Sequence, residues 1–196
     1  MTNKKETVCI YCGASNNVDQ QYKDAATRLG QLIAENGYNM VYGGGHHGLM
    51  GAAADAAIKH GSEVTGIIPS HLKDLEKVHK GHLAKLFIVE TMHERKQLMV
   101  DYADAFIILP GGLGTMDEFF EIFTWWQLGM HDKPIIICNV NGYWDPLISL
   151  IDHLIGQGFC PANNKDYLII IDNVDDIISA LENAPREKGD PKSKWI

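Results

Sequence analysis

The chain has 196 residues, 45% hydrophobic and 21% charged, which is ordinary for one globular domain. Its formal net charge of −8 argues against nucleic-acid binding, because nucleic-acid-binding proteins neutralise phosphates with a basic surface. No apolar run approaches the roughly 18 residues of a membrane-spanning helix, and the polar residues 1–7 do not resemble a signal peptide, so we expect a cytoplasmic protein.

Apolar runs alternate with longer amphipathic segments along the chain. Strands are predicted over residues 7–11, 39–42, 63–68, 86–89, 105–109, 134–139 and 168–171. Helices are predicted over residues 20–36, 48–60, 92–102, 116–128, 145–155 and 174–184. The alternation predicts βαβ units and an α/β fold, in which helices cover both faces of a parallel sheet. We expect one domain over residues 1–185 and a frayed polar tail over residues 186–196.

The first predicted strand contains the pair Cys9 and Cys12, whose C-x-x-C spacing is also found in redox and zinc sites. Residues three apart on a strand face opposite sides, however, and the chain has no second C-x-x-C. We therefore expect these two cysteines, with Cys138 and Cys160, to be small buried thiols in a reducing compartment.

A first glycine cluster follows the strand predicted at 39–42. Gly43, Gly45 and Gly48 fit the pattern G-x-G-x-x-G between a strand and a helix, which is typical of dinucleotide sites. Such a site also needs an acidic residue at the end of the next strand, but that strand ends in Ile68 and Pro69. NAD and FAD are therefore disfavoured. A tight turn that packs the next helix and a contact with a mononucleotide remain the alternatives.

Residues 70–85 are charged and show no periodicity. They are predicted to form either a loop near a substrate entrance or plain surface. His71, His79 and His82 lie in this segment, and the chain has no H-E-x-x-H pattern. We expect no metal site, because metal sites need ligands that converge at suitable distances.

The basic pair Arg95 and Lys96 follows the strand predicted at 86–89 and lies at the start of a helix. The carboxyl ends of parallel strands form the edge of the sheet where ligands bind. Arginine offers a planar fork that suits phosphate, whereas lysine offers a point charge. Cations in the first turn oppose the helix dipole, so the pair indicates a function. A solvated first turn is the alternative.

A second glycine cluster, Pro110-Gly111-Gly112-Leu113-Gly114-Thr115, follows the strand predicted at 105–109. Its glycines let backbone N–H groups approach a ligand closely, and the N-terminus of the next helix favours phosphate. Glu118 places a carboxylate within one turn of this predicted phosphate site. The alternative is structural, since Thr115 and Glu118 also fit a T-x-x-E capping box.

The helix that follows is rich in aromatic residues over positions 119–128. Aromatic side chains occur on more than one of its faces, which exceeds what one core-facing stripe needs. The surplus predicts either an oligomer interface or a helix that is buried inside one subunit.

Two of these segments, Met92-His93-Glu94-Arg95-Lys96 and residues 110–118, together resemble the M-H-x-R-K and P-G-G-x-G-T-x-x-E signatures of the Lonely Guy (LOG) family. The resemblance covers about residues 8–180. LOG members are phosphoribohydrolases that act on cytokinin riboside 5'-monophosphates, and related bacterial members hydrolyse AMP. Some relatives carry the label lysine decarboxylase, but this chain shows no constellation typical of pyridoxal phosphate.

The resemblance implies a Rossmann-like, doubly wound parallel sheet and a homodimer with sites near the interface. It implies that Arg95 and Glu118 are the catalytic pair and that no cofactor is required. The residues that it implies for binding a phosphorylated purine nucleoside are Lys96, Gly111, Gly112, Leu113, Gly114, Thr115, Met116, Asp117, Thr124 and Glu76.

The expected reaction splits AMP or N6-prenylated AMP into the free base and ribose 5-phosphate. Cleavage builds oxocarbenium character on the ribose, and the Glu118 carboxylate can stabilise that charge and direct a water. Arg95 does not readily surrender a proton, since arginine has a pKa above about 12. We therefore expect it to position the substrate or to stabilise developing charge, rather than to act as a general acid. The rival hypothesis is a carrier of a nucleotide or of the molybdenum cofactor, without turnover.

Overall fold

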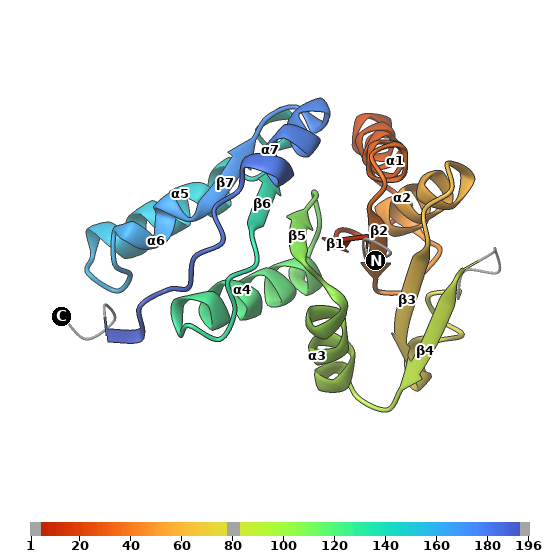
Figure 1. Cartoon of the computed structure of the whole chain (residues 1–196), viewed down its shortest axis with the longest axis horizontal. Helices are drawn as coiled ribbons and strands as arrows, with labels where there is room; N and C mark the ends of the chain where they lie inside the picture. The colour runs from red at the N-terminus through yellow and green to blue at the C-terminus, as the bar shows by residue number, and fades with distance from the viewer. Residues whose placement is uncertain (1–4, 78–82, 193–196) are drawn as a thin grey trace.

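All strands of the described chain form one parallel sheet. The computed structural model describes residues 5–77 and 83–192 (Figure 1). The strands are β1 (Thr7–Tyr11), β2 (Asn39–Tyr42), β3 (Val64–Pro69), β4 (Lys85–Val89), β5 (Ala105–Ile108), β6 (Ile135–Cys138) and β7 (Leu168–Ile171). They lie in the order β4-β3-β2-β1-β5-β6-β7, and every neighbouring pair is parallel. The order therefore reverses between β1 and β5, as in a doubly wound sheet.

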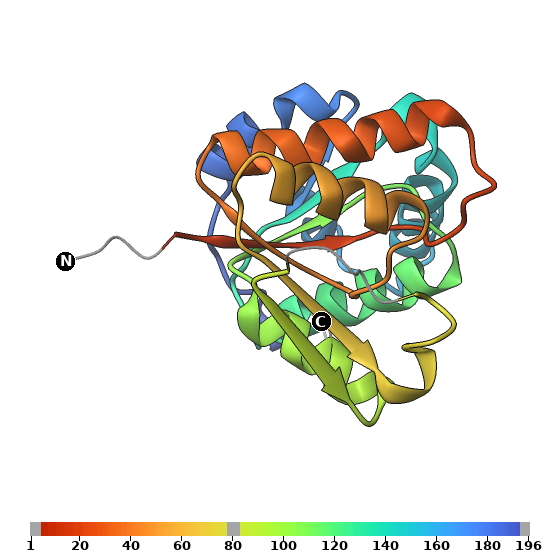
Figure 2. The same cartoon turned by 90° about the vertical axis from the view of Figure 1, so that its right-hand side faces the viewer.

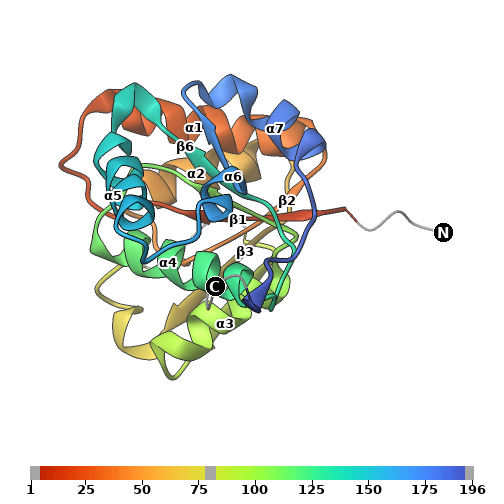
Figure 3. The ribbon, with the colours of Figure 1, turned by 90° about the vertical axis from the view of Figure 1, so that its left-hand side faces the viewer.

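Helices cover both faces of this sheet. They are α1 (Gln20–Glu35), α2 (Gly48–Lys59), α3 (Met92–Tyr102), α4 (Leu113–Gln127), α5 (Asp145–Gly156), α6 (Asn163–Asp166) and α7 (Ile177–Asn183). Figure 2 shows α1 and α2 on one side and α3 and α4 on the other. Helix α7 joins the first layer and α5 the second (Figure 3). The fold is a single-domain, Rossmann-like α/β sandwich, as the sequence predicts.

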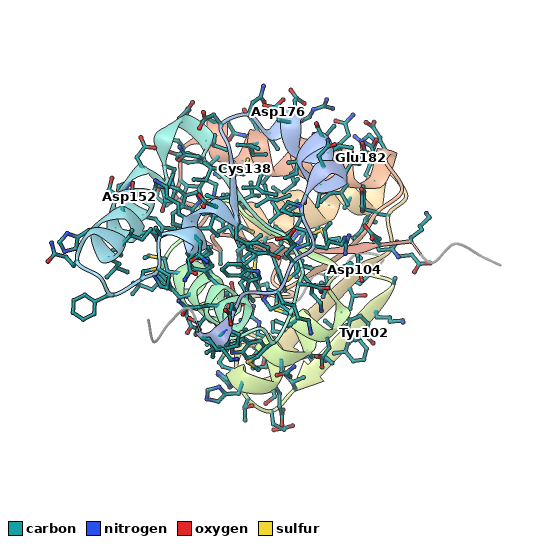
Figure 4. The ribbon with its side chains drawn as sticks, turned by 60° about the vertical axis from the view of Figure 1, so that its left-hand side comes forward. Tyr102, Asp104, Cys138, Asp152, Asp176 and Glu182 are labelled. Atoms are coloured by element: carbon teal, nitrogen blue, oxygen red, sulfur yellow. The ribbon has the colours of Figure 1, made fainter. Side chains whose placement is uncertain are left out.

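The core lies on both faces of the sheet because the central strands are buried on both sides. Cys9 packs in the layer of α3, α4 and α5, whereas Cys12 packs in the layer of α1, α2 and α7. The two thiols thus face opposite sides, and all four cysteines are unpaired. Figure 4 shows Cys138 of β6 among the core side chains.

None of the helices in residues 5–77 and 83–192 combines the length and apolar character needed to span a membrane.

Helix α4 begins at Leu113, three residues before the predicted start, and Gly112 is its N-cap. Thr115 therefore lies inside the first turn, and the capping box predicted for Thr115 and Glu118 is wrong. The reciprocal bonds of a capping box occur instead at α3, between Thr91 and Glu94. The remaining predicted boundaries differ by a few residues, except that α6 has no counterpart and residues 174–176 form a short 3-10 helix, η3 (Val174–Asp176).

The described part of the predicted tail, up to residue 192, makes several contacts with the rest of the chain. The indole Nε1 of Trp126 donates to the carbonyl oxygen of Glu187 at 2.8 Å. Gly189 lies so close to the backbone of Trp126 that a Cβ there would be 2.4 Å from its carbonyl oxygen. Arg186 pairs with Glu6 at 2.8 Å. The segment after α7 therefore packs against the end of α4, because an aromatic side chain offers it both surface and a donor.

Candidate active site

The loops after β1 and β5 meet where the order of the sheet reverses. The N–H of Gly13 donates to the carbonyl oxygen of Pro110 at 3.0 Å, and the N–H of Leu49 donates to that of Gly13 at 3.0 Å. These bonds bring the start of α2 to the same place. Open α/β sheets bind ligands in the crevice at such a point.

A pocket of about 190 Å³, here called the catalytic pocket, opens at this point. Its lining residues are Cys12, Gly13, Ala14, Met50, Glu76, Met92, Arg95, Gly112, Gly114, Thr115 and Glu118. They come from the β1 loop, α2, the segment before β4, α3 and the start of α4. The pocket thus brings together six residues implied by the family resemblance: Glu76, Arg95, Gly112, Gly114, Thr115 and Glu118.

The N-terminus of α4 forms one wall of the catalytic pocket. Its N-terminal i to i−4 bond runs from the Met116 N–H to the Gly112 carbonyl oxygen at 3.1 Å, and no side chain caps the helix. The N–H groups of the first turn therefore have no partner within the helix, which makes this end suitable for an anion. Thr115 packs tightly on Gly111, since a Cβ at position 111 would be 2.1 Å from the Thr115 hydroxyl oxygen.

Glu118 lies on the pocket side of α4 and is 9% exposed. Burial raises the pKa of its carboxyl group from 4.5 to about 7. The positive charges of Arg95 and Lys96 lower this pKa, whereas the negative charges of Asp117 and Glu76 raise it. Burial raises this pKa by more than the two cations lower it, so both protonation states of Glu118 are populated near neutral pH.

Arg95 is 5% exposed, so the alternative of a solvated first turn is wrong. Its Nη2 donates to the carbonyl oxygen of Gly43 at 3.0 Å and lies 3.8 Å from Oε2 of Glu76. Its Nε is buried and has no hydrogen-bond partner among the described residues. A Cβ at position 43 would be 1.9 Å from Nη2, so the first glycine cluster provides the room that Arg95 occupies. The guanidinium is thereby held in place while its Nε–H stays unused.

Lys96 is buried beside the pocket but does not line it. Its Nζ lies 2.6 Å from Oε2 of Glu121 and 3.0 Å from Oδ2 of Asp117, both on α4. Burial lowers the pKa of Lys96, but its bonds to Glu121 and Asp117 outweigh that effect and raise it. The ammonium group therefore ties α3 to α4.

The other residues implied by the resemblance lie outside the catalytic pocket. Gly111 borders a neighbouring pocket of about 310 Å³, here called the tyrosine pocket because Tyr22 and Tyr143 line it. Leu113 is 87% exposed, and Met116 packs against the core. Thr124 lines a separate hollow between α4 and α5. One chain therefore does not bring Leu113, Met116 or Thr124 to Glu118.

Sequence reasoning missed two contacts that shape the site. The Gly43 carbonyl oxygen holds Arg95, and the Tyr143 hydroxyl donates to the carbonyl oxygen of Gly111 at 2.6 Å. The glycine cluster that begins at Gly43 was a sequence signal for the contact with Arg95. The contact of Tyr143 had none, because Tyr143 lies 32 positions beyond Gly111 in a loop without a motif.

The aromatic helix is buried within this chain along part of its surface, which supports the second of the two alternatives for those residues. Phe119, Phe123 and Trp126 are buried within this chain. Trp125 is half-buried and lines a surface groove of about 590 Å³ between α3 and α4, here called the α3–α4 groove.

As for metals, residues 5–77 and 83–192 contain no group of three or more His, Cys, Asp or Glu side chains able to hold an ion. His79 and His82 lie outside the described residues.

Comparison with known proteins decides the family. Residues 50–181 match a family model described as possible lysine decarboxylase. The chain is 40% identical over 179 residues to the cytokinin riboside 5'-monophosphate phosphoribohydrolase of Rhodococcoides fascians, covering 91% of this chain and 90% of that protein. The chain belongs to the LOG family. Another LOG member, the rice (Oryza sativa subsp. japonica) enzyme of the same name, is 41% identical over 175 residues, covering 89% of this chain and 72% of that protein.

Solved structures with low sequence identity share the LOG chain's fold. The molybdenum cofactor binding protein of Rippkaea orientalis superposes with a TM-score of 0.70 at 20% identity, covering 92% of this chain and 98% of that one. The molybdenum cofactor carrier protein of Chlamydomonas reinhardtii has a TM-score of 0.70 at 15% identity, covering 91% and 97%. At such identities the likeness shows the fold alone.

Proposed function

We propose that this LOG protein hydrolyses the N-glycosidic bond of a purine nucleoside 5'-monophosphate, AMP or N6-prenylated AMP, to the free base and ribose 5-phosphate. Family membership carries the reaction class, hydrolysis of a glycosidic bond. One observation supports the assignment of the active site: buried Glu118 and Arg95 share a pocket with the uncapped N-terminus of α4.

The first turn of α4 binds the 5'-phosphate in this proposal. Gly112, Gly114 and Thr115 line the pocket and present backbone at the positive end of the helix dipole. Gly111 makes the close packing of this turn possible, and Arg95 adds positive charge to a chain of net charge −8. Phosphate binding then holds the reacting bond in place, since remote binding energy orients the substrate.

The Glu118 carboxylate faces the ribose and performs the hydrolytic step. It stabilises the oxocarbenium character that develops as the C1'–N9 bond breaks, with the bonding electrons leaving on the base. A water oxygen bonds to C1', and a proton of that water passes to Glu118. The raised pKa of about 7 suits a carboxylate that accepts a proton near neutral pH.

Arg95 positions the base in this scheme. Its Nε has no hydrogen-bond partner in the described part of the chain, and a hydrogen bond from it to the departing base would stabilise the charge that develops there. Glu76, 3.8 Å from Nη2, and the Gly43 carbonyl oxygen hold the guanidinium in orientation. Arginine stays protonated, so the base takes its proton from another source.

A homodimer is part of the proposal. Trp125 and Leu98 line the α3–α4 groove together with Val89 of β4, an edge strand, and offer apolar surface there. Lys96, Leu113, Met116, Asp117 and Thr124 are proposed as further substrate contacts, because the family resemblance implies sites near the interface of a homodimer. We further propose a cytoplasmic location, supported by four unpaired thiols, and no nucleic-acid partner, supported by the negative charge.

The deciding experiment supplies the purified protein with AMP, N6-prenylated AMP and adenosine, and measures free base and ribose 5-phosphate by chromatography. We expect release from one or both nucleotides, with kcat/KM at least about 100-fold above that for adenosine, because the phosphate site acts only on nucleotides. Equal values for AMP and adenosine would contradict the phosphate site. Tight nucleotide binding without release of any base would favour the rival carrier function.

A further inference from the structure

Tyr143 reaches the phosphate-binding turn from a part of the chain that the proposed mechanism does not use. It follows the short 3-10 helix η2 (Val140–Gly142), in the connection between β6 and α5. Its hydroxyl donates to the carbonyl oxygen of Gly111 at 2.6 Å. That carbonyl belongs to the peptide group that joins Gly111 to Gly112, the N-cap of α4.

The Tyr143 ring is held from two sides. It contacts the Tyr22 ring edge-on, with centroids 5.5 Å apart, and the Trp144 ring, with centroids 4.9 Å apart. The turn beneath it is also tied down by the buried Asn139, whose Oδ1 accepts from Trp144 N–H at 2.7 Å and whose Nδ2 donates to Asp145 at 2.9 Å. The hydroxyl is therefore placed by packing rather than by chance.

The Gly111–Gly112 peptide separates two pockets. In a trans peptide the C=O and N–H groups point in opposite directions. The Gly111 carbonyl points to Tyr143, which lines the tyrosine pocket, so the Gly112 N–H points away from Tyr143. Of these two pockets, Gly111 lines the tyrosine pocket alone, whereas Gly112 lines both and so carries the chain into the catalytic pocket. A hydrogen bond to the carbonyl oxygen further polarises the peptide and strengthens its N–H as a donor.

We propose that Tyr143 is a positioning residue for phosphate recognition: its hydroxyl holds the Gly111–Gly112 peptide so that the Gly112 N–H is presented to the 5'-phosphate. This inference rests on the proposed function for the identity of the ligand. Glycine-flanked peptides rotate easily, so an external hydrogen bond is needed to keep one orientation.

Tyr143→Phe tests the inference, because it removes the hydroxyl and keeps the ring. We measure Kd for ribose 5-phosphate and for adenine by calorimetry on the full chain. Loss of one neutral hydrogen bond is expected to weaken ribose 5-phosphate about 3- to 10-fold and to leave adenine unchanged. The matched control is Tyr102→Phe, which removes a hydroxyl at the C-terminal end of α3, outside both pockets, and should change neither Kd.

Three results would overturn the inference: unchanged affinity for ribose 5-phosphate in Tyr143→Phe, equal weakening of both ligands, or no binding of ribose 5-phosphate to the unmodified protein. The test is separate from that of the proposed function. If the unmodified protein releases no base but its affinity for ribose 5-phosphate depends on Tyr143, the hydrolase proposal fails and the positioning role stands. If base release is efficient and Tyr143→Phe is unaltered, the reverse holds.

Discussion

Glu118 combines burial with a position in the pocket at the N-terminal end of α4. Replacing it by glutamine keeps the shape and removes the carboxylate. We expect turnover of Glu118→Gln to fall by roughly 10²–10⁴-fold, because the variant can neither accept the proton nor stabilise the developing charge. Base release measures this. The control is Glu182→Gln, an exposed carboxylate on α7 (Figure 4), and near-normal turnover in folded Glu118→Gln would contradict the catalytic role.

The same substitution is expected to change stability in a pH-dependent way. Burial raises the pKa of Glu118 from 4.5 to about 7, so between these values the folded state binds more protons than the unfolded state. Stability contributed by this group is therefore present at low pH and lost as pH rises through this window.

Urea unfolding at about pH 5 and about pH 8 tests the sign of this effect. Because glutamine carries no charge to bury, Glu118→Gln should exceed the unmodified protein in unfolding free energy by up to about 3 kcal/mol at the higher pH. The difference should shrink at the lower pH. A variant that is less stable at the higher pH would show that Glu118 makes stabilising contacts as an anion.

A substitution at Arg95 tests whether geometry or charge matters at the second proposed catalytic residue. Arg95→Lys keeps the charge but loses the planar fork that reaches both Gly43 and a ligand. We expect kcat/KM for the nucleotide to fall by about 100-fold, because positioning is lost. Arg28→Lys, at an exposed ion pair with Asp175, is the control and should behave normally. Unchanged kinetics in Arg95→Lys would remove Arg95 from the site.

At the scale of elements, the start of α4 offers a matched pair of glycines. A Cβ at Gly111 would lie 2.1 Å from the Thr115 hydroxyl oxygen and 3.0 Å from the Gly13 nitrogen, whereas a Cβ at Gly112 meets nothing within 4 Å. Gly111→Ala should therefore lower the unfolding free energy by about 1–3 kcal/mol, as overpacking does. Gly112→Ala should remain within about 0.5 kcal/mol. Thermal and urea unfolding measure the stability of the two variants. Equal losses of unfolding free energy would contradict the packing argument.

The start of α4 also shows that a local sequence pattern does not always predict the N-cap of a helix. The pattern T-x-x-E occurs at Thr91 and again at Thr115, yet only Thr91 has the extended backbone of an N-cap. Thr115 is drawn into the helix because it packs on Gly111, a contact made by the folded turn. Capping propensity identifies both candidates, and only the tertiary packing selects between them.

At the scale of the whole molecule, the α3–α4 groove is expected to bind a second copy of the chain. Trp125→Glu places a charge in this groove and should convert the dimer to a monomer, because a buried unpaired charge opposes association. Light scattering during gel filtration measures the change in mass. Phe159→Glu, at an 80% exposed aromatic residue beyond α5, is the control and should leave the mass unaltered. A monomeric unmodified protein would contradict the proposed dimer.

The sequence by itself determined the strands, most helix positions and the glycine turns, because apolar runs and backbone preferences are local properties. It also placed Arg95 and Glu118 at the ligand-binding edge, since both follow predicted strands closely. Only the tertiary structure decided that Arg95 meets the carbonyl oxygen of Gly43, 52 positions away, and that Tyr143 reaches Gly111. The order of strands brings these loops together, and the burial that raises the pKa of Glu118 exists only once the layers have packed.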